Sequence, residues 1–447
     1  MKGAPNMNPA NHASRRVIYQ LFLRPFTPEG TLSAAATMLE HIKSLGVDFV
    51  YLCPVFWQDD EPLPEHWSDR QNQSGLGNPQ NPYRIKDYFH VDPEYGTDGD
   101  LRAFVEKAHA LGLRVLLDLV YYHCGPTAVF LQDHPDFVVR DENGAVRNGS
   151  WHFPELNFQS AGLREYLWEN MEYFVREYGV DGYRCDVGDQ VPLSFWEEGR
   201  RRLEALRPDI FMLNEGTNPA YLSAFDVNYD FGWAGRLPKV CTGEQSAAQL
   251  KAYWESVAAK LPEKGLVLRS LDNHDIAHDS GSVRIEDRIG AQAVEACLTL
   301  NFTLDGVPFL YNGYEIGDNG LHSIYGNRFY GKTFLIHWHR ALTTAGRERL
   351  EFVRGLASLR HSHPALSEGS VTWLAAGEGA LAFLRQGGGQ NMVIAVNLRA
   401  DPASLSLALP PACGKPVTAW CKRAACRVAG QQLQVDLDAY GFLAVEL

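Results

Sequence analysis

The chain contains no apolar stretch long enough to cross a membrane as a helix, and it begins with the polar segment MKGAPNMNPANHASRR, so no secretory leader is expected. Its eight cysteines include no Cys-x-x-Cys pair, the spacing typical of metal and redox sites. Excess basic charge is also lacking. The formal net charge is −13, which argues against nucleic acid because phosphate binding needs a basic face. These absences predict a cytoplasmic protein with reduced thiols and no membrane or nucleic-acid partner.

Apolar runs alternate with amphipathic segments over most of the 447 residues. The runs predict strands at 16–23, 47–54, 113–120, 180–187, 209–214, 225–229, 265–271 and 306–311. Helical periodicity predicts helices at 32–45, 98–112 (capped by Asp98), 161–178, 194–206, 245–261, 286–301 and 347–362. Strands that are apolar throughout are buried on both faces, so this order predicts a parallel sheet.

Eight such units favour a (β/α)8 barrel. The alternative, an open doubly wound sheet, is weakened because no Gly-x-Gly-x-x-Gly follows the first strand. Two long polar excursions interrupt the pattern, a predicted loop at 56–81 and a second at 123–158. From residue 367 short strands separated by turn residues predict an all-β sandwich over 367–447, appended to a catalytic barrel over 1–366.

Ionisable residues follow four of the predicted strands. They are Asp118 and His123, Arg184 and Asp186, Glu215, and His274 and Asp275. Barrel enzymes build their sites at the carboxyl ends of the strands. A single buried Asp or His is usually structural, and an Arg–Asp pair can simply cap a strand. Ionisable residues at the carboxyl ends of four strands on the same rim favour a catalytic site instead.

The chemistry that these groups suggest is cleavage of a glycosidic bond. A retaining glycosidase needs two carboxyl groups about 5–5.5 Å apart, and neighbouring strands lie ~4.8 Å apart, so Asp186 and Glu215 could serve as the pair. Arg184 shares a strand face with Asp186 and is expected to aim it and keep it ionised. Asp275 is expected to raise the pKa of Glu215. Cys185 points to the opposite face and is expected to be a buried, unreactive thiol.

The order of these residues resembles the alpha-amylase family, glycoside hydrolase family 13. The matching segments are DLVYYH (118–123), GYRCD (182–186), Glu215, NHD (273–275), NPYRIKDYFHVDPEYGT (81–97), FPELN (153–157), GVPFLYNGYEIG (306–317) and LASLRHSHPAL (356–366). The resemblance runs in order along nearly the whole chain. It implies hydrolysis of α-1,4 or α-1,6 bonds in α-glucans or malto-oligosaccharides through a covalent glycosyl-enzyme intermediate.

The resemblance also implies a role for each site residue. Asp186 would be the nucleophile, Glu215 the acid/base and Asp275 the transition-state stabiliser. The residues that would hold the attacked sugar are Tyr83, Asp118, His123, Arg184 and His274. The excursion at 123–158 would be a short domain B, and 367–447 would be domain C.

Three positions depart from the family pattern. Many members place a calcium-binding Asn where this chain has Tyr122, so no cofactor is expected and structural calcium, though left open, is argued against. Asp189 and Gln190 replace the Lys-His pair of many alpha-amylases, which argues against long-chain endo-amylase behaviour. Val187 and the segment DVGDQVPLSFW resemble the neopullulanase and cyclomaltodextrinase branch, whose N-terminal domain is lacking here.

Three alternative functions stay open at this point. A transglycosylase would use the same covalent intermediate but pass the sugar to another sugar. A catalytically silent sugar-binding relative typically loses a carboxylate, whereas all three are present here. A metal-dependent hydrolase on an unrelated barrel would need a cluster of His and Asp ligands, and the rim offers only His123 and His274. The sequence carries no signal for the oligomeric state.

Overall fold

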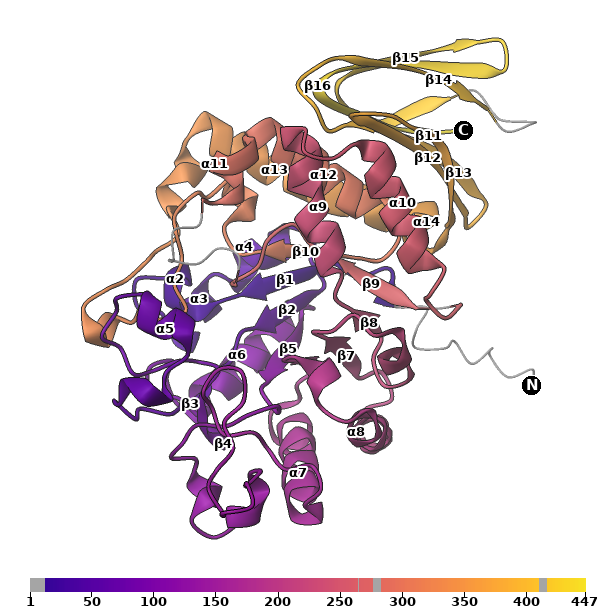
Figure 1. Ribbon diagram of the computed structural model, residues 1–447. Helices are drawn as coiled ribbons and strands as arrows, with labels where there is room; N and C mark the ends of the chain where they lie inside the picture. The colour runs from indigo at the N-terminus through magenta and orange to yellow at the C-terminus, as the bar shows by residue number, and fades with distance from the viewer. Residues whose placement is uncertain (1–12, 264, 276–282, 410–415) are drawn as a thin grey trace.

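The computed structural model describes residues 13–263, 265–275, 283–409 and 416–447. The polar start of the chain (1–12) and Cys413 lie outside them. Within the described residues, eight parallel strands close into a barrel (Figure 1). In spatial order they are β1 (Ile18–Leu21), β10 (Val307–Tyr311), β9 (Leu266–Arg269), β8 (Val227–Asn228), β7 (Phe211–Asn214), β6 (Gly182–Cys185), β5 (Arg114–Leu119) and β2 (Phe49–Leu52). Each predicted strand segment contains one of these strands, and the sheet is closed rather than open.

The helices lie around the barrel, in the excursion after β2 and beside the C-terminal sheet. They are α2 (Leu23–Phe26), α3 (Leu32–Thr37), α4 (Leu39–Ser44), α5 (Asp69–Gln73), α6 (Asp98–Ala110), α7 (Ala161–Tyr178), α8 (Leu193–Leu206), α9 (Phe231–Thr242), α10 (Ala247–Ala258), α11 (Ile285–Ile289), α12 (Ala291–Thr303), α13 (Thr344–Ser362) and α14 (Pro364–Glu368). In α7 the buried residues recur every three to four positions, and Gly179 ends the helix in the left-handed region at φ 69°.

Two helix predictions differ in detail from the structure. The segment 32–45 forms two short helices, α3 and α4, that meet at Met38. The cap of α6 is Thr97 rather than Asp98: the Thr97 hydroxyl accepts a hydrogen bond from the backbone N–H of Asp100, whose side chain in turn accepts one from the backbone of Thr97. Asp98 instead lies in the first turn, where a negative charge suits the helix dipole.

The excursion after β2 is more ordered than the predicted loop. Strand β3 (Phe56–Gln58) pairs antiparallel with β4 (Ile85–Val91), and the turn η1 (Pro64–His66) and helix α5 lie between them. The buried guanidinium of Arg84 donates to the backbone carbonyls of Asp59, Glu61 and Pro79 at 2.8–3.0 Å. These local hydrogen bonds order the excursion next to the barrel. Polar contacts of this kind leave no hydrophobic periodicity in the sequence, so the order could not be predicted from it.

Short 3-10 turns occupy many of the remaining connections. They are η2 (Val129–Leu131), η3 (Pro135–Phe137), η4 (Gly188–Gln190), η5 (Pro219–Ser223), η6 (Tyr314–Ile316), η7 (Arg328–Tyr330) and η8 (Trp338–Leu342). In the excursion at 123–158, isolated bridges such as His123–Glu155 and Val138–Leu156 fold the chain back on itself beside the rim.

The C-terminal segment forms an antiparallel sheet, as the all-β prediction required. Its strands are β11 (Ser370–Ala376), β12 (Ala380–Gly387), β13 (Gln390–Asn397), β14 (Ala403–Ala408), β15 (Val417–Ala429) and β16 (Gln432–Glu446). In the described residues these strands form one hydrogen-bonded sheet that bends on itself, because β16 pairs with β14 through its first half and with β13 through its second. Figure 1 shows this sheet beside α10, α12 and α14, and Lys422 binds Glu295 of α12 at 2.9 Å.

Seven cysteines lie in the described residues, and they form no disulfide there. Cys53, Cys124, Cys185, Cys241, Cys297, Cys421 and Cys426 are free thiols. Cys185 is fully buried, and burial raises the pKa of its thiol well above the usual value, so it stays protonated and unreactive.

Candidate active site

Neighbouring strands bring the predicted carboxyl groups together at one rim. Asp118 on β5 lies opposite Arg184 on β6 in the register. The backbone ladder continues one residue beyond the strands, since Asp186 N donates to Leu119 O at 2.9 Å and Glu215 N donates to Cys185 O at 3.0 Å. The backbone at these two acidic positions is therefore set by the barrel itself rather than by a loose loop.

Arg184 is the centre of the charge cluster. Its guanidinium is completely buried and reaches three carboxylates, Asp118 at 2.7 Å, Asp186 at 2.8 Å and Glu215 at 2.8 Å. Asp118 also accepts hydrogen bonds from the hydroxyls of Tyr51 and Tyr83. One cation thus holds three acids that come from three different strands.

Burial and the neighbouring charges together govern the protonation of this cluster. Burial raises the pKa of Asp186 well above its ordinary value, and the nearby Glu215 and Asp118 add to this while Arg184 opposes it. Burial also raises the pKa of Glu215, with Arg184 opposing and Asp275 adding. The direction of this shift does not match the expectation that Arg184 keeps Asp186 ionised, because burial raises the pKa of Asp186 more than the guanidinium lowers it. Asp186 and Glu215 therefore titrate as an interacting pair, and the pKa of each lies above that of a free carboxyl group.

Glu215 is held through one of its two carboxyl oxygens. Within the described residues its contacts fall on Oε2, which accepts a hydrogen bond from Val187 N at 2.8 Å and lies 2.8 Å from Arg184 Nη2. Oε1 is left to hold a proton. Val187 adopts the left-handed region at φ 36°, a strained conformation for a β-branched residue, and this conformation aims its N–H at Glu215.

His274 is held as a neutral ring with its proton on Nε2. Gln20 Oε1 accepts a hydrogen bond from His274 N at 3.3 Å, so Gln20 Nε2 donates to ring Nδ1 at 2.7 Å. The Tyr83 hydroxyl lies 2.5 Å from Nε2, and the two rings stack. Burial lowers the pKa of His274 to about 4, so the ring is uncharged at neutral pH.

Asp275 is paired with an arginine that the sequence analysis did not single out. Arg70, on α5, places Nη1 2.8 Å from Asp275 Oδ1. Burial would raise the pKa of Asp275, but the charges of His274, when protonated, and of Arg70 lower it to about 2. Asp275 is therefore ionised at neutral pH.

His123 lies at the rim among aromatic rings. Its ring centroid is 4.9 Å from that of Phe153 and 5.5 Å from that of Trp151. Burial lowers the pKa of His123 to about 3, so this side chain is also neutral. It can therefore act as a hydrogen-bond donor or acceptor but not as a cation.

Two adjoining hollows meet at Glu215. The inner hollow, of about 150 Å³, is lined by residues that include Tyr83, His123, Asp186, Glu215 and Asp275. The outer hollow, of about 300 Å³, is lined by residues that include Tyr122, Asp189, Thr217 and the half-exposed ring of Phe231. Trp151, Val187 and Glu215 line both. A ligand that spans the two hollows would pass directly over Glu215.

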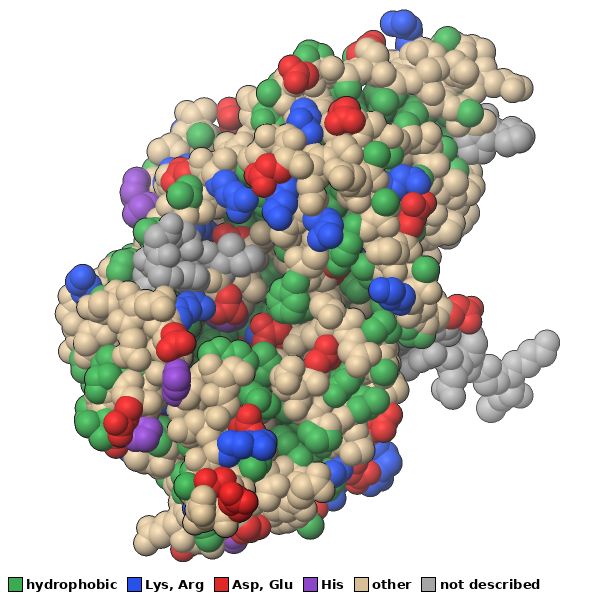
Figure 2. Space-filling view, viewed as in Figure 1, with side chains coloured by type: hydrophobic (Ala, Val, Ile, Leu, Met, Phe, Trp, Pro, Cys, Tyr) green, Lys and Arg blue, Asp and Glu red, His purple; other side chains and the backbone are tan. Residues whose placement is uncertain are grey.

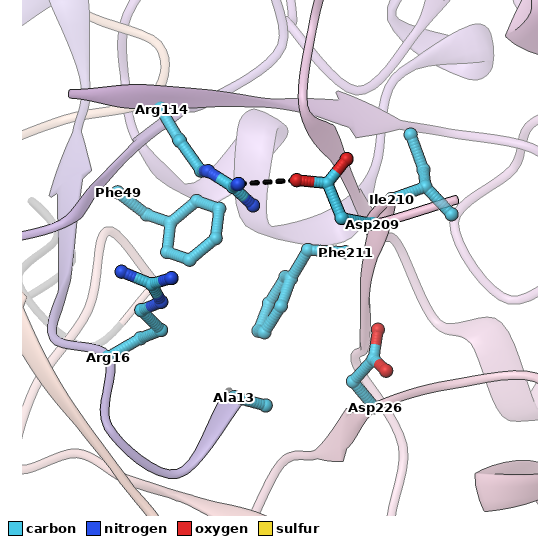
Figure 3. Close-up of a pocket in the computed structure, with 8 residues that line it drawn as sticks. All are labelled: Ala13, Arg16, Phe49, Arg114, Asp209, Ile210, Phe211 and Asp226. Carbon is cyan, nitrogen blue, oxygen red and sulfur yellow. Dashed lines mark hydrogen bonds and ion pairs between the residues drawn. The ribbon is translucent and has the colours of Figure 1, made fainter. Parts of the chain in front are cut away.

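A separate cavity opens at the other end of the barrel (Figure 3). Phe49, Arg114 and Phe211, which line it, are the first residues of β2, β5 and β7, so it lies at the amino ends of the strands. Arg114 pairs there with Asp209, and Arg16, which also lines it, pairs with Asp48. Its arginines are thus paired on the barrel face that serves stability rather than chemistry.

The structure gathers all the predicted site residues, and it adds three partners. Tyr83, Asp118, Arg184 and His274 form one continuous buried network with Gln20 and Tyr51, and Arg70 completes it at Asp275. Side chains alternate between the two faces of a strand, so sequence reasoning could have placed Gln20 of β1 and Tyr51 of β2 inside the barrel. Nothing in the polar segment around Arg70 indicated its partner.

The residues around Tyr122 do not fit the calcium site that the resemblance implies for many members. The Tyr122 hydroxyl donates to Glu155 Oε1 at 2.9 Å, and Arg147 Nε donates to Glu155 Oε2 at 2.8 Å. The Glu155 carboxylate is therefore already neutralised by the Arg147 guanidinium. Among the described residues, no three His, Cys, Asp or Glu side chains gather as metal ligands.

Fold and site together define a class of protein, a (β/α)8 barrel with a carboxylate-lined pocket at the carboxyl ends of its strands and an all-β domain after it. The sequence matches the family described as alpha amylase, catalytic domain, over residues 10–144 and 141–351. Residues 371–443 match the family described as maltogenic amylase, C-terminal domain. The chain belongs to the alpha-amylase family, as its motifs predicted.

Its relatives include a cyclomaltodextrinase and an alpha-amylase. A cyclomaltodextrinase from a Bacillus species is 26% identical over 404 residues, which cover 82% of this chain and 65% of that protein. An alpha-amylase from Haloarcula japonica is 29% identical over 373 residues, which cover 79% of this chain and 50% of that protein. This chain therefore spans between half and two thirds of the length of these curated relatives.

The crystal structure of a noncanonic maltogenic alpha-amylase from Thermotoga neapolitana shares the fold, with a TM-score of 0.81 and 24% identity over 97% of this chain and 98% of that one. In the described part of the chain, no helix has the length and apolar character needed to span a membrane.

Proposed function

We propose that the protein hydrolyses α-glucosidic bonds of α-glucans or malto-oligosaccharides with retention of anomeric configuration. The observation that carries the proposal is the placement of Asp186 and Glu215, which share one buried guanidinium while Glu215 lines both hollows. A glycosidic oxygen lies between two sugar rings, so its proton donor must lie between the two binding hollows. Asp186, in the inner hollow, then faces the anomeric carbon of the inner sugar.

The reaction follows from these positions. Glu215 donates its proton to the glycosidic oxygen while Asp186 attacks the anomeric carbon, so the leaving sugar departs through the outer hollow. The resulting glycosyl ester on Asp186 is hydrolysed when Glu215, now a carboxylate, takes a proton from water. Asp275, ionised beside Arg70, stabilises the positive charge that develops on the sugar ring.

The remaining site residues hold the inner sugar. Tyr83 presents a ring that is stacked on His274, so the pair offers a flat surface beside the carboxylates. His123 is neutral and can donate to a sugar hydroxyl without adding charge. Both ring nitrogens of His274 already have partners, Gln20 and Tyr83, so His274 acts by holding Tyr83 in place. Asp118 keeps Arg184 in place through two contacts at 2.7 and 2.9 Å.

The names of the relatives support malto-oligosaccharides as substrates. The similar proteins include cyclomaltodextrinases, maltogenic amylases and a neopullulanase. We assign the barrel to 1–366 with domain B at 123–158, and domain C to 367–447. A cytoplasmic location is supported by the intracellular maltogenic amylase of Bacillus subtilis, which is 24% identical. Acidic and basic side chains are interspersed over the face shown in Figure 2, which suits a sugar substrate better than a nucleic acid.

The proposal is tested with maltotriose, pullulan and isomaltose, with products resolved by chain length and anomeric form. We expect hydrolysis of at least one substrate, with the α-anomer released first because two displacements restore the configuration. Release of the β-anomer would contradict the proposed mechanism. Products longer than maltotriose would identify transfer as the main reaction, and no reaction with any substrate would favour a sugar-binding role.

A metal is not expected to contribute to stability or activity. Arg147 already neutralises Glu155 beside Tyr122, so incubation with EDTA followed by desalting should leave both the thermal midpoint and kcat unchanged. Differential scanning fluorimetry and a maltotriose assay measure the two quantities. A lower midpoint that is restored by Ca²⁺ but not by Mg²⁺ would show that a calcium site exists.

A further inference from the structure

Asp189 ties down the segment that carries Glu215. Its Oδ1 accepts a hydrogen bond from Asn214 Nδ2 at 2.9 Å. Its Oδ2 accepts two more, from the backbone N–H of Thr217 at 2.8 Å and of Asn218 at 2.9 Å. These donors lie on both sides of Glu215, so one carboxylate spans the turn in which the proton donor lies.

The two turns also approach each other too closely for a side chain to fit between them. A Cβ on Gly216 would lie 2.1 Å from Asp189 Oδ1, and a Cβ on Gly188 would lie 2.2 Å from Asn214 Oδ1. Asn214 is held in turn by Asn228, whose Oδ1 accepts from Asn214 Nδ2 at 2.9 Å. The turn after β6 and the turn after β7 are therefore interlocked through Asp189.

The chemistry of position 189 explains why an acid stands there. The three groups that it meets are N–H donors, and a carboxylate has the lone pairs to accept from all of them. The lysine typical of many alpha-amylases at this position could accept none of them. Asp189 lines the outer hollow, but its carboxylate is engaged by these three N–H groups of the protein.

We propose that Asp189 is a positioning residue that holds Glu215 at the boundary between the two hollows, a role that rests on the proposed function. A proton donor must come within about 2.6–3.2 Å of its target, and a 1 Å displacement can cost about 10²-fold in rate. Without Asp189 the segment 214–218 loses three hydrogen bonds, so the side chain of Glu215 is held less precisely, while Asp186 keeps its place at the end of β6.

The test compares two substrates that differ in how much they need the acid. Maltotriose has a poor leaving group and requires the proton, whereas 2-chloro-4-nitrophenyl α-maltotrioside releases an acidic phenol that leaves without it. For Asp189→Ala we expect kcat/KM to fall about 100-fold with maltotriose. With the aryl substrate we expect it to fall less than about 5-fold, because the acid then contributes little. Asp189→Asn keeps one acceptor oxygen, so its kcat/KM with maltotriose should lie between the values of wild type and Asp189→Ala.

Two controls separate the possible outcomes. Glu215→Gln tests the proposed function itself and should show a still larger difference between the two substrates. If it does not, the role of Glu215 fails whatever Asp189 does. Asp209→Ala, the same substitution at the other end of the barrel, should leave both rates unchanged. Equal losses with both substrates in Asp189→Ala and Asp189→Asn, or no loss with either, would overturn the positioning role.

Discussion

Asp186→Asn is expected to lower kcat with maltotriose by about 10⁴- to 10⁶-fold, because the amide removes the nucleophile that forms the covalent intermediate. The same substitution should leave the protein folded, with a thermal midpoint at or above that of wild type. Asp186 is one of three carboxylates around Arg184, and its raised pKa shows that its charge is unfavourable there. Steady-state kinetics and a thermal melt at pH 8 measure the two effects.

The combination of lost activity and kept stability is what distinguishes a nucleophile from a structural acid. If Asp186 served only to cap β6, its replacement would lower the thermal midpoint and leave much of the activity. Activity above about one hundredth of the wild-type kcat in Asp186→Asn would therefore contradict the assigned role.

Arg184→Met is expected to abolish activity and to destabilise the protein by about 3–5 kcal/mol at pH 8, because three buried carboxylates lose their common cation. Arg184 lowers the pKa of Asp118, Asp186 and Glu215, so its removal raises all three further above their unfolded values. Carboxyls with raised pKa values bind protons more tightly in the folded state. The loss should therefore be largest at pH 8 and shrink towards pH 5 as these groups are protonated.

Thermal midpoints of wild type and Arg184→Met at pH 5 and pH 8 test this dependence. Arg114→Met provides a matched control, since Arg114 forms an exposed pair with Asp209 at the other end of the barrel. Such a surface pair contributes about 0–1 kcal/mol, so this control should change the midpoint little at either pH. A deficit in Arg184→Met that is equal at the two pH values would show that lost packing, not uncompensated charge, is responsible.

The barrel could be predicted because its strands are buried on both faces. Each apolar run, such as 113–120 or 306–311, marks a strand without reference to any other part of the chain. The details that differed depend on local polar bonds. Thr97 rather than Asp98 caps α6, and Arg84 orders the excursion at 56–81 through carbonyl contacts that leave no periodic signal.

The site could be predicted because parallel strands in a barrel deliver their carboxyl ends to one rim. Asp118, Asp186 and Glu215 meet there as expected, and Arg184 binds all three. Arg70 could not be predicted, since it lies in a polar segment 205 residues away from Asp275 and only the folded excursion brings it there.

The sequence by itself determined the strand order, the identity of the acids at the rim and the family, because hydrophobic period and motif spacing are properties of the chain. Tertiary structure alone decided how those acids share protons and which groups hold them. Burial and the distances among charges from separate strands set the raised pKa of Asp186 and the lowered pKa of Asp275. In the sequence, Asp189 is only a departure from the lysine of many alpha-amylases. In the structure, it accepts three hydrogen bonds from the segment around Glu215, because hydrogen bonds depend on how the chain folds and not on residue order.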